Sequence, residues 1–394
     1  MMGKGKIIGT VIAAVAVPAA VIAAAVVILP QFGILTDNTL YYFSDGEDDK
    51  TVSVGKEDIS AYESRYSDAM SDFYFSTLSE NDKYIYNATV YAADNGYSTI
   101  YLPGSLFNDS EEKMSAVETV LTRLSCDSPF IAHNYTINGT LTMKRSQYAG
   151  NEYYIIELET LGGEYKARRE AAYQKAESVV SQMPASCDTD AEKAEYIYKY
   201  IAENVSYQYD GYSFDNVPIA DALIDKKAVC DGYCDTFAML MNMCGIDTAT
   251  VNGSNGKEWH AISFSKIDGE YYYFDVTADS IAFAEGFSPA FYFGMSWDTT
   301  RSYFTFDQRY ETLMSKTKGS LAASITDCTI DDLSDESAQQ TAQLLSGKGS
   351  IMIKFADTIT GDEKREYAQN VAKYCGGKIG TAEYNGLIGY RLAA

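Results

Sequence analysis

Apolar residues recur at helical spacing through the centre of the chain. Tyr165–Met183 forms one such stretch, which ends before Pro184. Asp188–Asp190 then offers capping side chains for a second helix that runs to about Asn204. Four positions of that helix share one apolar face because they are spaced i, i+3, i+4 and i+7: Ala194, Ile197, Tyr198 and Ile201.

A third helix and a hairpin follow along the chain. Apolar residues at helical spacing continue up to Gly245, a residue type that often ends helices, and they are Phe237, Leu240, Met241 and Cys244. The segments 247–252, 260–267 and 270–276 are then predicted to be successive strands. Asp268-Gly269 is a two-residue hairpin signal, so the last two strands are expected to pair antiparallel.

The first 160 residues carry weaker patterns. Residues 30–56 are polar and acidic and are predicted to be a linker, and residues 57–160 are predicted to form an N-terminal α/β region. Helical character extends over 57–94, where Tyr62, Tyr66, Met70 and Phe73 have helical spacing. The remaining predicted elements are a helix over Glu111–Leu124 and strands over Phe130–Ile137 and Tyr153–Leu158.

The C-terminal part is predicted to be a separate small unit. Residues 315–345 begin with a stretch rich in Ser, Thr and Asp and are predicted to be a linker. Residues 346–394 follow with the pattern of an α/β unit: strand Ser350–Phe355, helix Glu363–Tyr374, strand Lys378–Tyr384 and strand Gly386–Leu392. No residue pattern in this unit indicates chemistry.

The amino terminus has the pattern of a membrane segment. Residues 1–6 include Lys4 and Lys6, and residues 7–29 are an uninterrupted uncharged run. About 20 apolar residues cross a bilayer core, and the basic tip favours a cytoplasmic amino terminus. We therefore expect a single-pass anchor with the bulk of the chain outside the cell. A cleaved signal peptide, which would make the protein secreted, is the alternative, although its apolar region is usually about 7–15 residues long.

Charge and cysteine content narrow the function classes. The 55 acidic residues against 31 basic ones give a formal charge of -24, which repels phosphate backbones, so nucleic acid is not an expected partner. The seven cysteines are an odd number for an exported chain and leave at least one thiol unpaired. At this low density in a long chain, a disulfide framework is not expected.

Cys230 is the candidate nucleophile. It follows a loop and precedes an apolar-periodic helix, so its sulfur is expected over the helix amino terminus, where the dipole lowers a thiol pKa. Backbone N–H groups at that helix start can contribute to an oxyanion site. The chain has only two histidines, so a Cys–His mechanism has little choice of base. His260 begins a predicted strand, whereas His133 lies away from any motif and is expected to be structural.

Asp275 is the candidate orienting residue for His260. Antiparallel pairing across Asp268-Gly269 brings positions 260–264 near positions 272–276. A carboxylate at that distance can fix the imidazole tautomer and stabilise the imidazolium. The sequence does not fix the register, so direct opposition of the two residues is not predicted.

The block from about 165 to 280 resembles bacterial exported transglutaminase-like domain proteins, which form a papain-like cysteine superfamily. The matching motifs are Tyr209-Asp210, Ala222-Leu223, Lys227–Tyr233, Gly245-Ile246, Val251–Gly253, His260-Ala261 and Asp275–Thr277. The resemblance implies an α+β fold over residues 165–314, in which the helix bearing the cysteine packs on an antiparallel sheet. It also implies that Cys230 is the nucleophile, His260 the base and Asp275 the orienting residue.

Two positions depart from the family pattern. Ile262 and Ala278 stand where the family has tryptophan. Aromatic residues at these places serve packing or form the substrate wall and carry no protons. Their replacement leaves the three site residues in place but brings the substrate groove into question.

Other polar residues of the helix start have simpler interpretations. Cys234 lies on the apolar face and is expected in the core, while Asp231 and Asp235 are expected as solvated charges, with Asp231 able to tune substrate charge. A zinc site from Cys230, Cys234, Cys244 and His260 is an alternative, but it lacks the paired cysteine spacing of structural zinc sites. The sequence gives no reason to expect a cofactor or a bound metal.

The sequence therefore predicts an exported, membrane-anchored cysteine enzyme that cleaves or transfers peptide amide acyl groups through a thioester, with a peptide or protein at the cell surface as its substrate. Peptidase activity is favoured over crosslinking through the resemblance. A non-catalytic surface module that keeps the fold and binds a peptide or the cell wall is the alternative.

Overall fold

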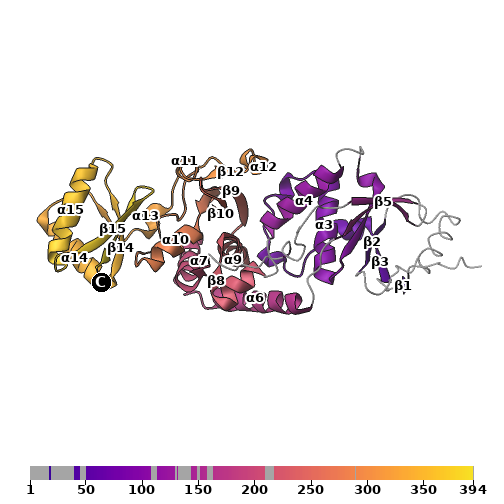
Figure 1. The fold of residues 1–394 in the computed structure, drawn as a ribbon, viewed down its shortest axis with the longest axis horizontal. Coiled ribbons are helices and arrows are strands. Elements are labelled where there is room, and N and C mark those ends of the chain that lie inside the picture. Colours follow the sequence, from indigo (N-terminus) through magenta and orange to yellow (C-terminus); the bar gives the residue numbers. More distant parts are fainter. Residues whose placement is uncertain are drawn as a thin grey trace, which may run out of the picture. The chain divides into compact units, whose positions relative to one another are not determined.

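The computed structural model describes residues 17–18, 40–44, 50–107, 113–128, 131, 143–148, 151–157, 163–208, 217–288 and 290–393 (Figure 1). The chain divides into two compact units. The first unit comprises residues 1–65, 75–125 and 134–161, and the second comprises 66–74, 126–133 and 162–394. Two short segments of the N-terminal half thus belong to the second unit.

The first unit is an α/β arrangement around a six-stranded sheet of order β1-β3-β2-β4-β6-β5, in which every neighbouring pair is antiparallel. The strands are β1 Val17–Pro18, β2 Leu40–Ser44, β3 Lys50–Gly55, β4 Thr99–Pro103, β5 Met143–Tyr148 and β6 Asn151–Glu157. The helices are α2 Lys56–Ser60, α3 Glu80–Asn95 and α4 Lys113–Asp127, whose last two residues belong to the second unit.

The helical pattern over 57–94 breaks in the middle. Between α2 and α3 the chain forms only short 3₁₀ turns at Ser67–Ala69 and Phe75–Thr77. The physical reason is that residues 66–74 pack in the second unit, where the hydroxyl of buried Tyr74 donates to the carbonyl of Thr250 at 3.1 Å. The helical character expected over 57–94 is therefore interrupted there, because these aromatic residues serve two different cores.

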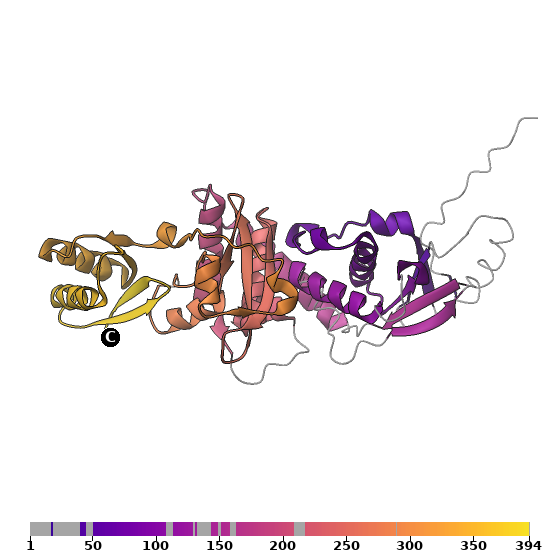
Figure 2. The ribbon, with the colours of Figure 1, turned by 90° about the horizontal axis from the view of Figure 1, so that it is seen from above.

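The second unit contains the predicted helices and hairpin. The helices α6 Gly163–Ser181, α7 Asp190–Asn204 and α9 Cys230–Met243 precede a four-stranded antiparallel sheet of order β11-β10-β9-β12. Its strands are β9 Thr248–Ser254, β10 Trp259–Ile267, β11 Glu270–Phe274 and β12 Thr305–Phe306 (Figure 2). Thr189 caps α7, within the capping segment that the sequence predicts, and it forms a capping box with Glu192.

The two faces of this sheet are covered differently. Ser263 on β10 donates its hydroxyl to the carbonyl of Cys234 at 3.0 Å, so α9 covers that face. The other face buries an aromatic cluster that includes Ile262, Phe264, Tyr273, Phe304 and Phe306. A helix that begins with the cysteine and packs on an antiparallel sheet is the predicted α+β arrangement, which is confirmed.

Shorter elements connect these parts of the second unit. Residues 206–207 (β7) pair parallel with residues 227–228 (β8), directly before α9. The remaining short helices are α8 Pro218–Ala220, a π-helical turn at Asp221–Asp225, α10 Val276–Ala284, α11 Trp297–Arg301, α12 Gln308–Glu311 and α13 Ala322–Ile325.

The C-terminal elements agree with the predicted strand–helix–strand–strand order. The sheet has the order β13-β14-β16-β15, with β13 Cys328–Ile330, β14 Ser350–Phe355, β15 Ile379–Tyr384 and β16 Leu387–Leu392. Helices α14 Asp335–Lys348 and α15 Gly361–Tyr374 pack against it. The segment 315–345, predicted as a linker, differs: it contains α13, β13 and most of α14.

Several predicted features lie outside the described residues. Apart from Val17 and Pro18, which pair with β3, the apolar run 7–29 is among them. So are His133, Tyr209-Asp210 and, apart from Ile131, the predicted strand Phe130–Ile137. Among the residues that the structure does describe, no helix has the length and apolar character needed to cross a membrane.

Gly253 tests the packing between β9 and β12. A Cβ there would lie 2.3 Å from the carbonyl oxygen of Thr305 and 2.6 Å from the ring of Phe304. We expect Gly253→Ala to lower the free energy of unfolding by about 1–3 kcal/mol, because neither the backbone nor the buried ring can move freely. Urea unfolding measures this. Gly347→Ala, in the interior of α14, is the matched control, since a Cβ there meets nothing within 4 Å. This substitution should stabilise the protein slightly. Equal effects of the two substitutions would contradict the packing argument.

Candidate active site

Cys230 is the first residue of α9 and is partly buried. The first turn of this helix packs tightly on the preceding segment, because a Cβ at Gly232 would lie 2.7 Å from the Ala228 side chain and 2.9 Å from the Pro218 carbonyl oxygen. Glycine is therefore required for the close approach. The motif thus places the thiol at a helix amino terminus, as predicted.

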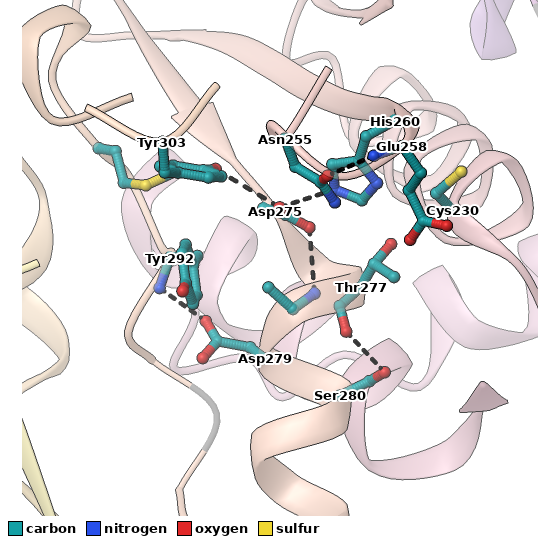
Figure 3. A network of polar contacts seen from close by, with 12 residues as sticks. Cys230, Asn255, Glu258, His260, Asp275, Thr277, Asp279, Ser280, Tyr292 and Tyr303 are labelled. Atoms are coloured by element: carbon teal, nitrogen blue, oxygen red, sulfur yellow. Dashed lines mark hydrogen bonds and ion pairs between the residues drawn. The ribbon is translucent and has the colours of Figure 1, made fainter. Parts of the chain in front are cut away.

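His260 and Asp275 meet beyond the end of the hairpin. In the register of β10 and β11, Ser263 lies opposite Phe274, so Asp275 follows the last paired residue of β11. Asp275 is the N-cap of α10, and its Oδ1 accepts the N–H of Ala278 at 3.1 Å. Its Oδ2 lies 2.8 Å from Nε2 of His260 (Figure 3). Each carboxylate oxygen thus has a separate role.

The imidazole of His260 connects the carboxylate to the thiol. Nε2 is bound to Asp275, so Nδ1 is the ring nitrogen left to face Cys230, whose thiol pKa the imidazole lowers. The ring is buried and contacts Phe304 edge-on, with centroids 6.2 Å apart. The structure therefore brings Cys230, His260 and Asp275 together in the predicted order.

A buried polar network lies behind Asp275, and no pattern in the sequence indicates it. The hydroxyl of Tyr198 lies 2.9 Å from the carbonyl oxygen of Asp275 and 2.6 Å from Oδ2 of Asp279. Asp279 also accepts the backbone N–H groups of Phe291 and Tyr292 at 2.9 and 2.8 Å. The only sequence signal for Tyr198 was its place on an apolar helix face. The only one for Asp279 was its i+4 spacing from Asp275.

Tyr303 is a further, partly buried contact of the carboxylate. Its hydroxyl donates to Oδ2 of Asp275 at 3.4 Å, and its ring meets that of Tyr292 edge-on. The backbone N–H of Asp275 donates to the carbonyl of Tyr292 at 3.1 Å. The segment after α10 therefore supports Asp275 through both side chains and backbone.

The pKa of His260 is raised to about 10. Burial opposes the charged imidazolium, but the charge of Asp275 and the hydrogen bonds to Asp275 and Cys230 outweigh it. The imidazole is thus held in its protonated form at neutral pH.

The pKa of the Cys230 thiol is raised, which makes the prediction of a lowered thiol pKa wrong. Burial is the largest cause, and the neighbouring carboxylate of Asp231, whose Oδ1 lies 3.7 Å from the sulfur, adds to it. The hydrogen bond and charge of His260 and the N–H of Ala261 act in the opposite direction. Removal of the thiol from water therefore outweighs the helix amino terminus.

The departures from the family pattern have a structural explanation at one position. Ile262 is fully buried in the aromatic cluster on the face of the sheet away from α9, so a different residue there changes core packing. Ala278 is partly exposed and contributes its N–H to the Asp275 cap. Ile262 therefore departs from the family pattern at a core position.

The other polar residues of α9 are more buried than expected. Cys234 is buried, as predicted for a core residue, and its thiol donates to the carbonyl of Asp231 at 3.4 Å. Asp235 is also buried, so the prediction of a solvated charge is wrong. The reason is that its turn of α9 lies under neighbouring elements of the second unit, and Asp235 Oδ1 accepts from the Cys234 thiol at 3.6 Å.

Trp259 is an exposed aromatic residue beside the site. Its side chain is 59% exposed, the largest value among the big apolar side chains of the described residues. Because side chains alternate along a strand, Trp259 shares a face of β10 with Ser263, the face that α9 covers. Trp259 therefore lies at the exposed start of β10, next to His260 in the chain.

Comparisons with known proteins agree with this geometry. Residues 177–289, which include the three site residues, match the family model described as Transglutaminase-like superfamily. The chain therefore carries a transglutaminase-like domain. None of the curated proteins matches the chain.

Two solved structures are similar over about a third of this chain. A candidate cysteine protease from Cytophaga hutchinsonii is 13% identical over 35% of this chain and 62% of its own, with a TM-score of 0.24. A TGase is 17% identical over 35% of this chain and 45% of its own, also with a TM-score of 0.24. The chain spans less than two thirds of the length of either protein.

Asp231 gives a test of the thiol electrostatics. Asp231→Asn removes a carboxylate that raises the pKa of Cys230, so the thiolate fraction below that pKa should rise. We expect alkylation by iodoacetamide at pH 7 to become about threefold faster, which corresponds to a lowering of roughly half a pKa unit. Mass spectrometry of the Cys230 peptide measures the rate. Asp357→Asn, an exposed change in the C-terminal elements, is the control; an unchanged or slower rate in Asp231→Asn would contradict the assignment.

Burial of Asp279 predicts a pH dependence of stability. Burial raises the pKa of this carboxyl from 3.8 to about 7, against the hydrogen bonds that favour its charged form. The folded protein thus holds a proton that the unfolded chain releases, so this contribution to stability is complete at low pH and declines as the pH rises towards 7. In urea unfolding between pH 4 and 7, Asp279→Asn should therefore gain stability relative to wild type as pH rises. A constant difference would refute the buried proton.

Proposed function

We propose that this protein is an exported, membrane-anchored cysteine enzyme that transfers peptide amide acyl groups through a thioester. The observation that carries the proposal is the 2.8 Å contact between His260 and Asp275, with the Cys230 thiol at a helix amino terminus and under the electrostatic influence of the same imidazole. Export and anchoring rest on the basic tip and the apolar run 7–29.

The acylation step follows from this arrangement. Loss of one proton from the Cys230–His260 pair gives a thiolate beside an imidazolium, stabilised by the N–H of Ala261 and the charge of Asp275. The sulfur attacks the amide carbonyl carbon, and backbone N–H groups of the first turn of α9 can stabilise the oxyanion. His260 then donates its proton to the amide nitrogen, the C–N bond breaks, and the amine leaves a thioester on Cys230.

The deacylation step reverses these roles. Neutral His260 accepts a proton from the acceptor, which attacks the thioester and releases the Cys230 sulfur. Water as the acceptor gives hydrolysis, and a primary amine gives transfer. Hydrolysis of a peptide amide is the first candidate, and the exposed side chain of Trp259, next to His260 in the chain, offers an apolar contact for the peptide.

A comparison of Cys230→Ala with wild type tests the proposal. Both full-length proteins, in detergent, are incubated with a peptide pool and separately with casein plus a fluorescent primary amine. We expect wild type to cleave peptides, and Cys230→Ala to lose about 10³-fold or more of that rate because no thioester can form. Incorporation of the amine in place of cleavage would assign transfer.

Cys187→Ala is the matched control, because Cys187 is a partly exposed thiol outside the site. It should retain full turnover. Equal turnover in wild type and Cys230→Ala would contradict the proposed nucleophile. Absence of any turnover, together with tight binding of peptides or cell-wall fragments, would instead favour the non-catalytic surface module.

A further inference from the structure

Tyr198 and Asp279 meet behind the proposed site without touching the thiol. Tyr198 comes from α7, and its hydroxyl reaches the carbonyl oxygen of Asp275 and the carboxylate of Asp279. All three residues are buried. Asp279 forms no ion pair with a basic side chain in the described part of the chain. The charges and hydroxyls around it are Asp275, Tyr198, Tyr292 and Tyr303.

The network connects three separate segments at Asp275. Tyr198 contacts the Asp275 backbone from α7. Asp279 accepts two successive backbone N–H groups, those of Phe291 and Tyr292, and the carbonyl of Tyr292 accepts the N–H of Asp275. The backbone of Asp275 is therefore fixed on both its N–H and its C=O side by groups that depend on Asp279.

A single hydroxyl proton cannot satisfy both acceptors of Tyr198. When Asp279 is ionised, Tyr198 donates to its carboxylate at 2.6 Å. When Asp279 carries a proton, that proton can go to the Tyr198 oxygen, and the Tyr198 hydroxyl then donates to the Asp275 carbonyl at 2.9 Å. The hydrogen bond to Asp275 is therefore complete only in the second arrangement.

We propose that Tyr198 and Asp279 are positioning residues that hold Asp275 at the distance at which its carboxylate orients His260. Only the expected effect of these residues on turnover rests on the proposed function. Its structural part, that the His260–Asp275 contact depends on two residues that reach neither the thiol nor the imidazole, stands on the hydrogen bonds above. Residues that support a functional side chain in this way commonly change activity about 10- to 100-fold when replaced.

The test uses full-length protein labelled with ¹⁵N on histidine. The imidazole N–H between His260 and Asp275 should give a downfield proton resonance that exchanges slowly with water, and the chain has only two histidines, so His260→Ala assigns it. In Tyr198→Phe we expect this resonance to exchange at least tenfold faster. Peptide turnover, where present, should fall about tenfold in kcat with KM changed less than twofold.

Tyr74→Phe is the matched control. It also removes a buried tyrosine hydroxyl that donates to a backbone carbonyl in the same unit, that of Thr250 at 3.1 Å, but it lies outside the site. Both variants should lose similar stability, whereas only Tyr198→Phe should change the His260 resonance. Asp279→Asn, which can donate to the Tyr198 oxygen, should change it less than Asp279→Ala.

The outcomes separate this inference from the proposed function. An unchanged His260 resonance in Tyr198→Phe, or an equal change in Tyr74→Phe, would overturn the positioning role even if the protein cleaves peptides. If only Tyr198→Phe changes the His260 resonance and the wild-type protein shows no turnover, the positioning role is supported and the proposed function fails.

Discussion

The buried carboxylate of Asp275 is the interaction on which the rest of the site depends. One oxygen caps α10 and the other holds the imidazole of His260, so a single side chain ends the hairpin, starts a helix and orients the base. A buried charge is costly unless it is paired and hydrogen-bonded. Asp275 meets this requirement through His260, Ala278 and Tyr303, and the loss of any one of them would leave charge poorly compensated.

The electrostatics of the thiol show how burial competes with the helix dipole. A helix amino terminus acts over about one turn and contributes modestly, whereas removal of a thiolate from water is a larger effect. In this protein burial and Asp231 raise the pKa of Cys230, while Asp275 raises that of His260. Formation of a Cys230 thiolate therefore depends on the Cys230–His260 pair losing one proton together, which makes the pair the titrating unit.

Local patterns predicted much of this fold and site. The capping box at Thr189, the hairpin at Asp268-Gly269 and the helix at Cys230 all arise from neighbours along the chain, so their signals are in the sequence. The carboxylate–imidazole contact followed from the hairpin because strand pairing is nearly local. The catalytic roles of the three residues remain predictions.

Features that depend on distant segments were not predictable. Residues 66–74 pack in the second unit, and this packing interrupts the helix that their apolar spacing favours. Tyr198 and Asp279 are 81 positions apart and have ordinary roles in their own helices, so only the packing of α7 against α10 reveals their contact. Asp235 was predicted to be a solvated charge, although it is buried. Hydrophobic periodicity in the sequence does not show which elements cover the first turns of a helix.

The two tryptophans give the protein an intrinsic optical readout. Trp297 is 7% exposed and stacks on Phe306, so its fluorescence should be blue-shifted and insensitive to aqueous quenchers. Trp259 is 59% exposed and adjoins His260 in the chain, so its emission should be red-shifted and accessible to iodide or acrylamide. A quenching titration therefore reports separately on the sheet core around Trp297 and on the exposed start of β10 at Trp259, without any added label.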